Sequence, residues 1–157
     1  DRSCPLNQYG GAEEAFNIVD ETLKMSNFSV DGGRELTRGE FMLGTASALY
    51  SPFTWPDLIN GFVAMIENGD GSIHQELADQ LAGRRDDGSY DNSQAVLFLV
   101  NCADDPKRPS KEYIKEAVTE VADQLPHFGP AIRGDTGCAG LEESIDPLHI
   151  VQADLEI

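Results

Sequence analysis

The sequence lacks the features of a membrane-spanning or targeting segment. No apolar run approaches the roughly 20 residues that a membrane helix needs, so we predict no membrane insertion. The opening, Asp1-Arg2-Ser3-Cys4-Pro5, does not form a signal peptide. This opening also lacks Met, and we expect that the chain was cut from a longer protein.

Cationic residues are scarce. Eleven Lys and Arg residues stand against 28 Asp and Glu residues, which gives a formal net charge of −17. Nucleic acid and anionic membranes are therefore excluded as partners, because phosphate binding needs clustered Lys and Arg. The acidic residues attract a cationic ligand such as the α-ammonium group of a peptide, or serve only to keep the domain soluble.

The motifs of a catalytic or metal site are also missing. No Ser has Gly two residues before it, so the G-x-S-x-G turn that carries a hydrolase nucleophile is absent. His74, His127 and His149 have no recognisable Ser or Cys to activate. A possible calcium loop has Ile66 and Leu77 where carboxylates are required. We expect no catalytic residue, metal or cofactor in this chain.

Three cysteines, Cys4, Cys102 and Cys138, form an odd set. Either one disulfide partner has been lost by truncation, or all three thiols are reduced. No C-x-x-C spacing occurs, so a zinc or thioredoxin-like site has no support.

Apolar residues recur at helical spacing along most of the chain. They predict helices over about 12–25, from a Thr37–Glu40 capping box to 49, from 55 to about 68, from about 72 to a Gly83 stop, and over about 111–125. A short hairpin is expected within 27–36 and a coil over 126–140. The result is an all-α, multi-helix fold with at most a short β-hairpin. Its 157 residues suggest a single domain.

The most apolar segment, residues 95–100, is either a buried strand or a buried helix by periodicity alone. Its entry through Asp91, Asn92 and Ser93 supplies three good N-cap residues. This entry favours a central helix.

Several short motifs together resemble one family. Ala48 to Pro56, read ALYSPFTWP, is similar to the "LYSPxTWP" stretch of tripeptidyl aminopeptidase-type α/β hydrolases of actinobacteria. Gly88 to Asp104, Pro126 to Gly140 and Cys4-Pro5-Leu6 resemble further segments of the same family in the same order. One departure is Leu141, where the family usually has Trp.

The resemblance implies that residues 1–157 are the helical cap, or lid, domain excised from such a hydrolase. The nucleophile then lies upstream and the Asp and His of the triad lie downstream, while residues 154–157 lead into the next core strand. The chain alone is expected to be inactive although its parent is a serine peptidase. The implied partners are the α/β-hydrolase core of the same polypeptide and a peptide substrate. The family is exported or envelope-associated, which implies a Cys102–Cys138 disulfide and a Cys4 without its partner.

The resemblance and carboxylate chemistry together suggest four substrate-binding residues. Asp104 pairs with the peptide ammonium, Asn101 bonds a peptide group, and Trp55 forms an apolar wall; Asn92 completes the set. Each has a simpler interpretation, in which Asp104 ends a helix, Asn92 is an N-cap and Trp55 packs in the core. His127 is expected to be a packed loop residue.

Two other functions stay open at this point. The chain is alternatively a standalone acidic helical module that binds a cationic partner, or a complete small enzyme of an unrecognised type. A G-x-S-x-G motif upstream and Asp and His downstream in the reading frame distinguish the cap from both.

Overall fold

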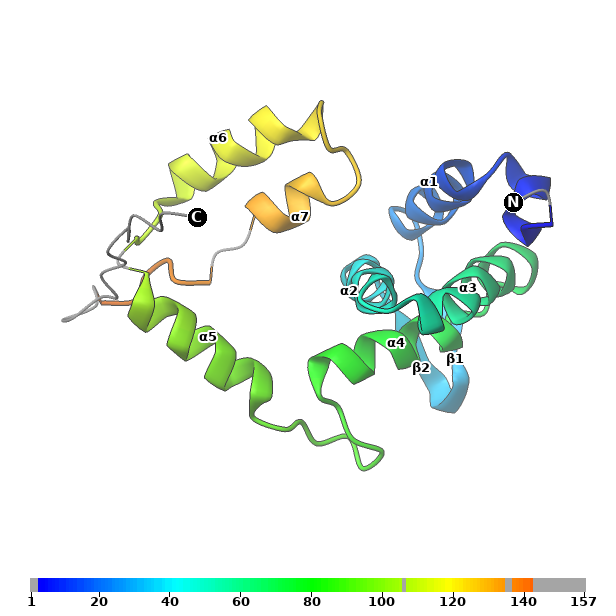
Figure 1. Ribbon diagram of the computed structural model, residues 1–157, viewed down its shortest axis with the longest axis horizontal. Coiled ribbons are helices and arrows are strands. Elements are labelled where there is room, and N and C mark those ends of the chain that lie inside the picture. The colour runs from blue at the N-terminus through cyan, green and yellow to red at the C-terminus, as the bar shows by residue number, and fades with distance from the viewer. Residues whose placement is uncertain (1–2, 106, 135–136, 143–157) are drawn as a thin grey trace, which may run out of the picture. The chain divides into compact units, whose positions relative to one another are not determined.

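The computed structural model describes residues 3–105, 107–134 and 137–142 (Figure 1). The chain divides into two compact units, residues 1–91 and residues 92–157. The single-domain organisation expected for residues 1–157 stays a prediction, and the lead-in at 154–157 lies outside the described residues.

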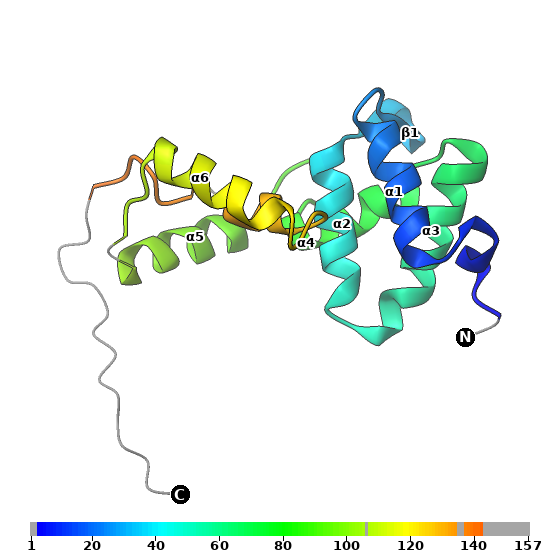
Figure 2. The ribbon, with the colours of Figure 1, turned by 90° about the horizontal axis from the view of Figure 1, so that it is seen from above.

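The first unit contains four α-helices and one hairpin among its described residues (Figure 2). After a short 3-10 helix, Pro5–Tyr9, the order is α1 (Ala12–Leu23), β1 (Phe28–Val30), β2 (Arg34–Leu36), α2 (Arg38–Leu49), α3 (Trp55–Asn68) and α4 (Ser72–Ala82). The two strands are antiparallel, with Phe28 opposite Leu36. These elements follow the predicted order.

The ends of the helices follow from local chemistry. Thr37 is the N-cap of α2, where its hydroxyl accepts a hydrogen bond from the Glu40 amide while the Glu40 carboxylate accepts one from the Thr37 amide. Gly83 ends α4 with φ of 70°, a left-handed conformation that glycine adopts without a Cβ penalty. Both features were read correctly from the sequence.

Aromatic rings form the centre of the first unit. The ring centroids of Phe16 and Phe41 are 5.0 Å apart, and those of Phe41 and Phe62 are 5.7 Å apart with an edge-to-face arrangement. The imidazole of His74 stacks on Phe41 at 5.3 Å and meets the edge of Phe62 at 5.0 Å. His74 is fully buried, so this histidine is a core residue of the unit.

Two glycines allow helices to approach His74 on α4 closely. A Cβ atom at Gly44 of α2 would lie 2.4 Å from the His74 carbonyl oxygen. A Cβ at Gly61 of α3 would lie 2.3 Å from the Nδ1 atom of His74. Because real Cβ atoms do not approach other atoms so closely, both positions require glycine for the observed packing.

Ion pairs attach the hairpin and α2 to the rest of the first unit. Arg34 of β2 donates two hydrogen bonds, of 2.6 and 2.9 Å, to the Asp79 carboxylate on α4. This bidentate pair holds the pKa of Asp79 below its ordinary value. Arg38 donates to Asp20 of α1 at 2.6 Å. Both contacts join segments that are distant in sequence.

The second unit contains α5 (Ser93–Asp104), α6 (Lys111–Ala122) and a short α7 (Gly129–Arg133). A disulfide joins Cys102 near the end of α5 to Cys138, with Cα atoms 5.4 Å apart. This is the bridge that the family resemblance implies. Cys4, in the first unit, is a free cysteine.

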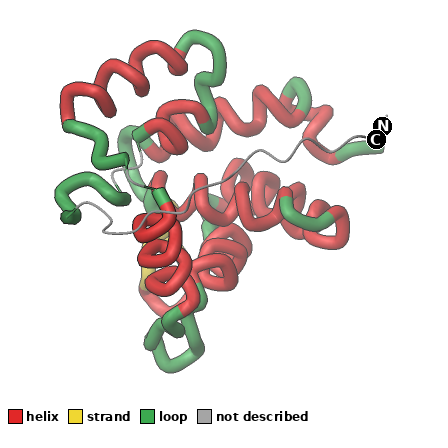
Figure 3. Tube along the Cα trace, turned by 60° about the vertical axis from the view of Figure 1, so that its left-hand side comes forward, coloured by secondary structure: helices red, strands yellow, loops and turns green. Residues whose placement is uncertain are grey.

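The predicted all-α class is confirmed (Figure 3). Within the described residues, no helix is both long and apolar enough to cross a bilayer. One prediction of local structure was wrong: α7 lies in the stretch expected to be coil, because Pro130 occupies the first turn of a helix, where it loses no hydrogen bond.

The helix expected at 95–100 exists, but it is not central. Val96, Leu97, Phe98, Leu99 and Val100 expose between 38 and 60% of their surface, and only Cys102 of α5 is buried. Five consecutive apolar residues surround the whole helix axis, so they cannot all face one neighbour. Helix α5 therefore presents a large apolar surface that the described residues of the second unit leave uncovered.

Candidate functional site

The segment Asn101–Asp104, predicted to bind a peptide terminus, forms the last turn of α5. Asn101 and Asp104 are both exposed and lie three residues apart, so they share a face of the helix. Among the described residues, no cation pairs with the Asp104 carboxylate. Asp104 does end the helix, as the simpler interpretation holds, and its carboxylate is also available to a ligand.

The other two predicted residues, Asn92 and Trp55, belong to other parts of the chain. Asn92 is the N-cap of α5 but makes no side-chain capping bond, and it is separated from Asp104 by the helix length of about 18 Å. Trp55 begins α3, in the first unit, and exposes 50% of its surface. Trp55 is half-exposed and is not a core residue of the first unit, whereas the other three predicted residues belong to the second unit.

Arg108 fixes the loop that follows α5. Its guanidinium donates to the carbonyl oxygens of Cys102 at 2.8 Å, Asp105 at 2.6 Å, Lys107 at 2.9 Å and Glu142 at 3.0 Å. A cation at the carboxyl end of a helix is favourable because of the helix dipole. This single side chain thus holds together the end of α5, the loop and the segment at 142.

A second set of bonds orders the start of α6. The Asp105 carboxylate accepts a hydrogen bond from the Lys107 amide at 2.9 Å. The Ser110 hydroxyl accepts one from the Tyr113 amide at 3.1 Å, as a helix N-cap does. These two bonds order the Asp105–Lys107 contact and the start of α6, although much of this part of the chain is exposed.

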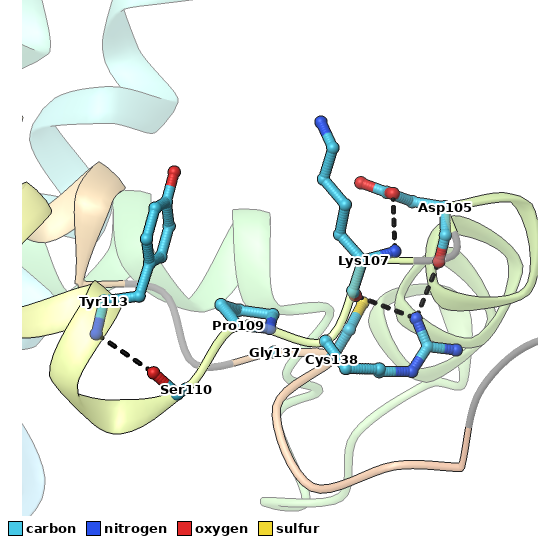
Figure 4. A pocket seen from close by; sticks show the side chains of 8 residues that line it. Asp105, Lys107, Pro109, Ser110, Tyr113, Gly137 and Cys138 are labelled. Atoms are coloured by element: carbon cyan, nitrogen blue, oxygen red, sulfur yellow. Dashed lines mark hydrogen bonds between the residues drawn. The ribbon is translucent and has the colours of Figure 1, made fainter.

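A cavity of about 610 Å³ lies along this loop (Figure 4). Its walls come from the α5–α6 loop, the first turn of α6 and the segment held by the disulfide: Asp105, Lys107, Arg108, Pro109, Ser110, Tyr113, Gly137 and Cys138. None of the four predicted substrate-binding residues lines it, although Asp104 is the neighbour of Asp105 in sequence.

The cavity gathers positive charge in a strongly acidic chain. Four of the 11 Lys and Arg residues lie within 107–115, and two of them, Lys107 and Arg108, line the cavity. Neither forms a salt bridge with a described carboxylate. This cluster was not predicted, although the concentration of cations within 107–115, against a net charge of −17, is visible in the sequence.

The two histidines that the structure describes, His74 and His127, occupy packed positions. Both ring nitrogens of His74 are buried without a hydrogen-bond partner, and burial lowers its pKa from 6.5 to about 4. His127 is partly buried in the segment before α7, as expected of a packed loop residue, and His149 lies outside the described residues. No cluster of three or more His, Cys, Asp or Glu side chains suited to a metal occurs in the described part of the chain.

Comparison with known proteins identifies relatives. No protein-family model matches the chain. A 109-residue part, 66% of the chain, is 37% identical to Carboxylesterase B of Mycobacterium tuberculosis. A 73-residue part, 46% of the chain, is 36% identical to Serine protease Hip1 of M. tuberculosis and of M. bovis. The chain contains a hydrolase-related region.

The similarity covers a minor part of each relative. The chain spans 20% of the length of Carboxylesterase B and 14% of the length of Serine protease Hip1. The activities in these names belong to the whole relatives.

Proposed function

We propose that this chain is the cap of a serine peptidase of the tripeptidyl aminopeptidase-like α/β-hydrolase type. In this proposal it covers the active site of a hydrolase core in the same polypeptide and supplies no catalytic residue. The observation that carries the proposal is the similarity to hydrolases over about a fifth of their length by a chain without a G-x-S-x-G turn.

The exposed surface of α5 supports a docking role. Its apolar residues would lose contact with water against a partner, and each fully buried Leu or Val side chain contributes about 1.5–3 kcal/mol. Uncovered apolar patches of this kind mark interaction sites. We assign the hydrolase core as the surface that α5 contacts, because the hydrolase relatives extend far beyond the aligned region.

The last turn of α5 supports a role in binding the N-terminus of a peptide substrate. The free Asp104 carboxylate is the natural partner of a peptide ammonium, and Asn101 on the same face can bond a peptide group. The Cys102–Cys138 disulfide supports an extracytoplasmic location, where disulfides persist.

A labelling experiment tests the division of roles. The purified 157-residue chain is incubated with a fluorophosphonate probe and assayed with peptidyl chromogenic substrates. We expect neither labelling nor turnover, because the activated serine lies on the core. Stoichiometric labelling of one serine in this chain would overturn the proposal.

A substitution in the full-length protein tests the role of Asp104. Asp104→Asn should lower kcat/KM for substrates with a free N-terminus about tenfold or more, and leave substrates with a blocked N-terminus unchanged. Asp123→Asn is the control, since Asp123 is an exposed acid at the end of α6 in the same unit. Equal effects of Asp104→Asn on both substrate classes would reduce Asp104 to a structural residue.

A further inference from the structure

We propose that the cavity between the α5–α6 loop and the Cys138 segment binds a carboxylate that is attached to an apolar group. This carboxylate belongs either to the C-terminus of a peptide or to a free organic acid. The inference concerns a cavity within the second unit alone, and it holds whether or not the chain caps a hydrolase.

Lys107 provides the direct contact for the carboxylate. Its ammonium group, which carries three donors, has no partner among the described residues. Figure 4 shows the side chains of Lys107 and Tyr113 extending to the same side of the loop, with Pro109 between them. An anion in the cavity therefore has the Lys107 cation at one end and an aromatic side chain at the other.

Arg108 adds charge from a fixed position. Four of its five N–H groups are used by four carbonyl oxygens, which leaves one donor unassigned. Carbonyl oxygens satisfy its hydrogen bonds but do not neutralise its charge. Among the residues that the structure describes, no carboxylate forms a salt bridge with this guanidinium, which stands in the cavity wall.

The local charge favours an anion in spite of the acidic chain. The two cations in the cavity wall outnumber the one carboxylate, Asp105, which is engaged by the Lys107 amide. The neighbouring carboxylates of Asp104, Glu112 and Glu142 do not line the cavity. Because the charged side chains that line it are mainly cationic, the cavity favours an anion over the ammonium group that Asp104 would receive.

The remaining walls require an apolar group beside the carboxylate. Pro109, the ring of Tyr113 and the Cys138 end of the disulfide offer mainly carbon and sulfur atoms. The volume of about 610 Å³ lies within the range of small-molecule sites, about 300–1,000 Å³. A carboxylate that carries one aromatic or branched side chain matches both the charge and the walls.

The test titrates the oxidised 157-residue chain with small probes while ¹⁵N amide shifts are recorded. N-acetylphenylalanine carries the carboxylate, N-acetylphenylalaninamide lacks it, and phenylalaninamide carries only an ammonium. We expect the first probe to shift amides of residues 107–113 and 137–138, and the other two to leave them unchanged. Binding of the neutral amide as tightly as the acid, or no binding of the acid, would overturn the proposal.

Two matched variants locate the binding. Lys107→Gln should weaken binding of N-acetylphenylalanine about threefold to tenfold, the range for loss of one charged hydrogen bond. Lys111→Gln makes the same change of charge at an exposed position outside the cavity wall, and should change binding less than twofold. Equal weakening by both variants would contradict a specific site.

A final comparison distinguishes the two sources of the carboxylate. 3-Phenylpropionate has the ring and the acid but no peptide group. Tighter binding of N-acetylphenylalanine identifies a peptide C-terminus as the ligand, and equal affinities identify a free organic acid. Either result supports the carboxylate site, and both are independent of whether the longer protein hydrolyses peptides.

Discussion

Single residues decide the packing of the first unit more than the apolar pattern does. The helical spacing of Phe41 and Phe62 predicts that they face the core, which they do. It does not predict that a fully buried His74 lies between them, because a histidine in an amphipathic helix reads as polar. The helical spacing also does not identify Gly44 and Gly61, whose missing side chains leave space for His74.

Gly61→Ala tests this packing. The added methyl group would lie 2.3 Å from His74 Nδ1, so we expect a loss of stability of about 1–3 kcal/mol from overpacking. Urea unfolding followed by circular dichroism measures the change. The control is Gly39→Ala near the start of α2, where the nearest atom is 3.9 Å away. That exchange should be neutral or slightly stabilising, and an equal loss in both variants would refute the packing argument.

Elements were predictable where local chemistry defines their ends. The capping box at Thr37 and the glycine at 83 fixed two boundaries correctly. Helix α7 was missed because it is short and begins with Gly129 and Pro130, and the exposure of α5 was missed because an apolar run carries no information about which neighbours cover it. The cavity was missed for a different reason: its walls come from two separate segments that the disulfide joins.

Reduction of the disulfide should destabilise the second unit selectively. Closing a loop with a sequence separation of 36 residues contributes about 3–4 kcal/mol in the chain-entropy model. Hydrogen exchange with and without a reductant should therefore show faster exchange in α5 and α6 and unchanged exchange in α2 and α4. Cys4→Ser is the control and should behave as the unmodified chain, because Cys4 is outside the bridge. Faster exchange throughout both units would contradict the assignment.

At the scale of the whole molecule, acidity is the dominant feature of the composition. The net charge of −17 predicts that nucleic acid is not a partner, yet it concealed a local cluster of cations. The charge also affects stability as the pH falls. Protonation of carboxylates relieves charge repulsion in the folded state and so favours folding. In the first unit, His74 and four carboxylates with lowered pKa values act in the opposite direction.

The pH dependence of stability should show the effect of His74. Its pKa is 6.5 when exposed and about 4 when buried, so the unfolded chain binds the proton first and stability falls between pH 6.5 and 4. The full difference corresponds to about 3 kcal/mol. Asp20, Glu40, Asp70 and Asp79 have lowered pKa values, and their contributions are lost only below about pH 4.

The His74→Leu variant separates the contribution of His74 to the pH dependence from that of the carboxylates. The variant should lose the slope of unfolding free energy between pH 6.5 and 4.5 and keep the decline at lower pH, as measured by urea unfolding at a series of pH values. An unchanged slope in the variant would assign the transition to other groups.

The close approach of α2 and α3 to His74 has a consequence for tracing related proteins. Both contacts depend on positions where any side chain collides with the neighbouring helix, so these two sites tolerate far less substitution than the apolar residues around them. A chain with the same helical arrangement should carry two glycines 17 residues apart, at the positions of Gly44 and Gly61. A residue with a small ring, as His74 has here, should follow 13 residues later. That spacing can serve to recognise distant chains with this helical arrangement when overall sequence identity has been lost.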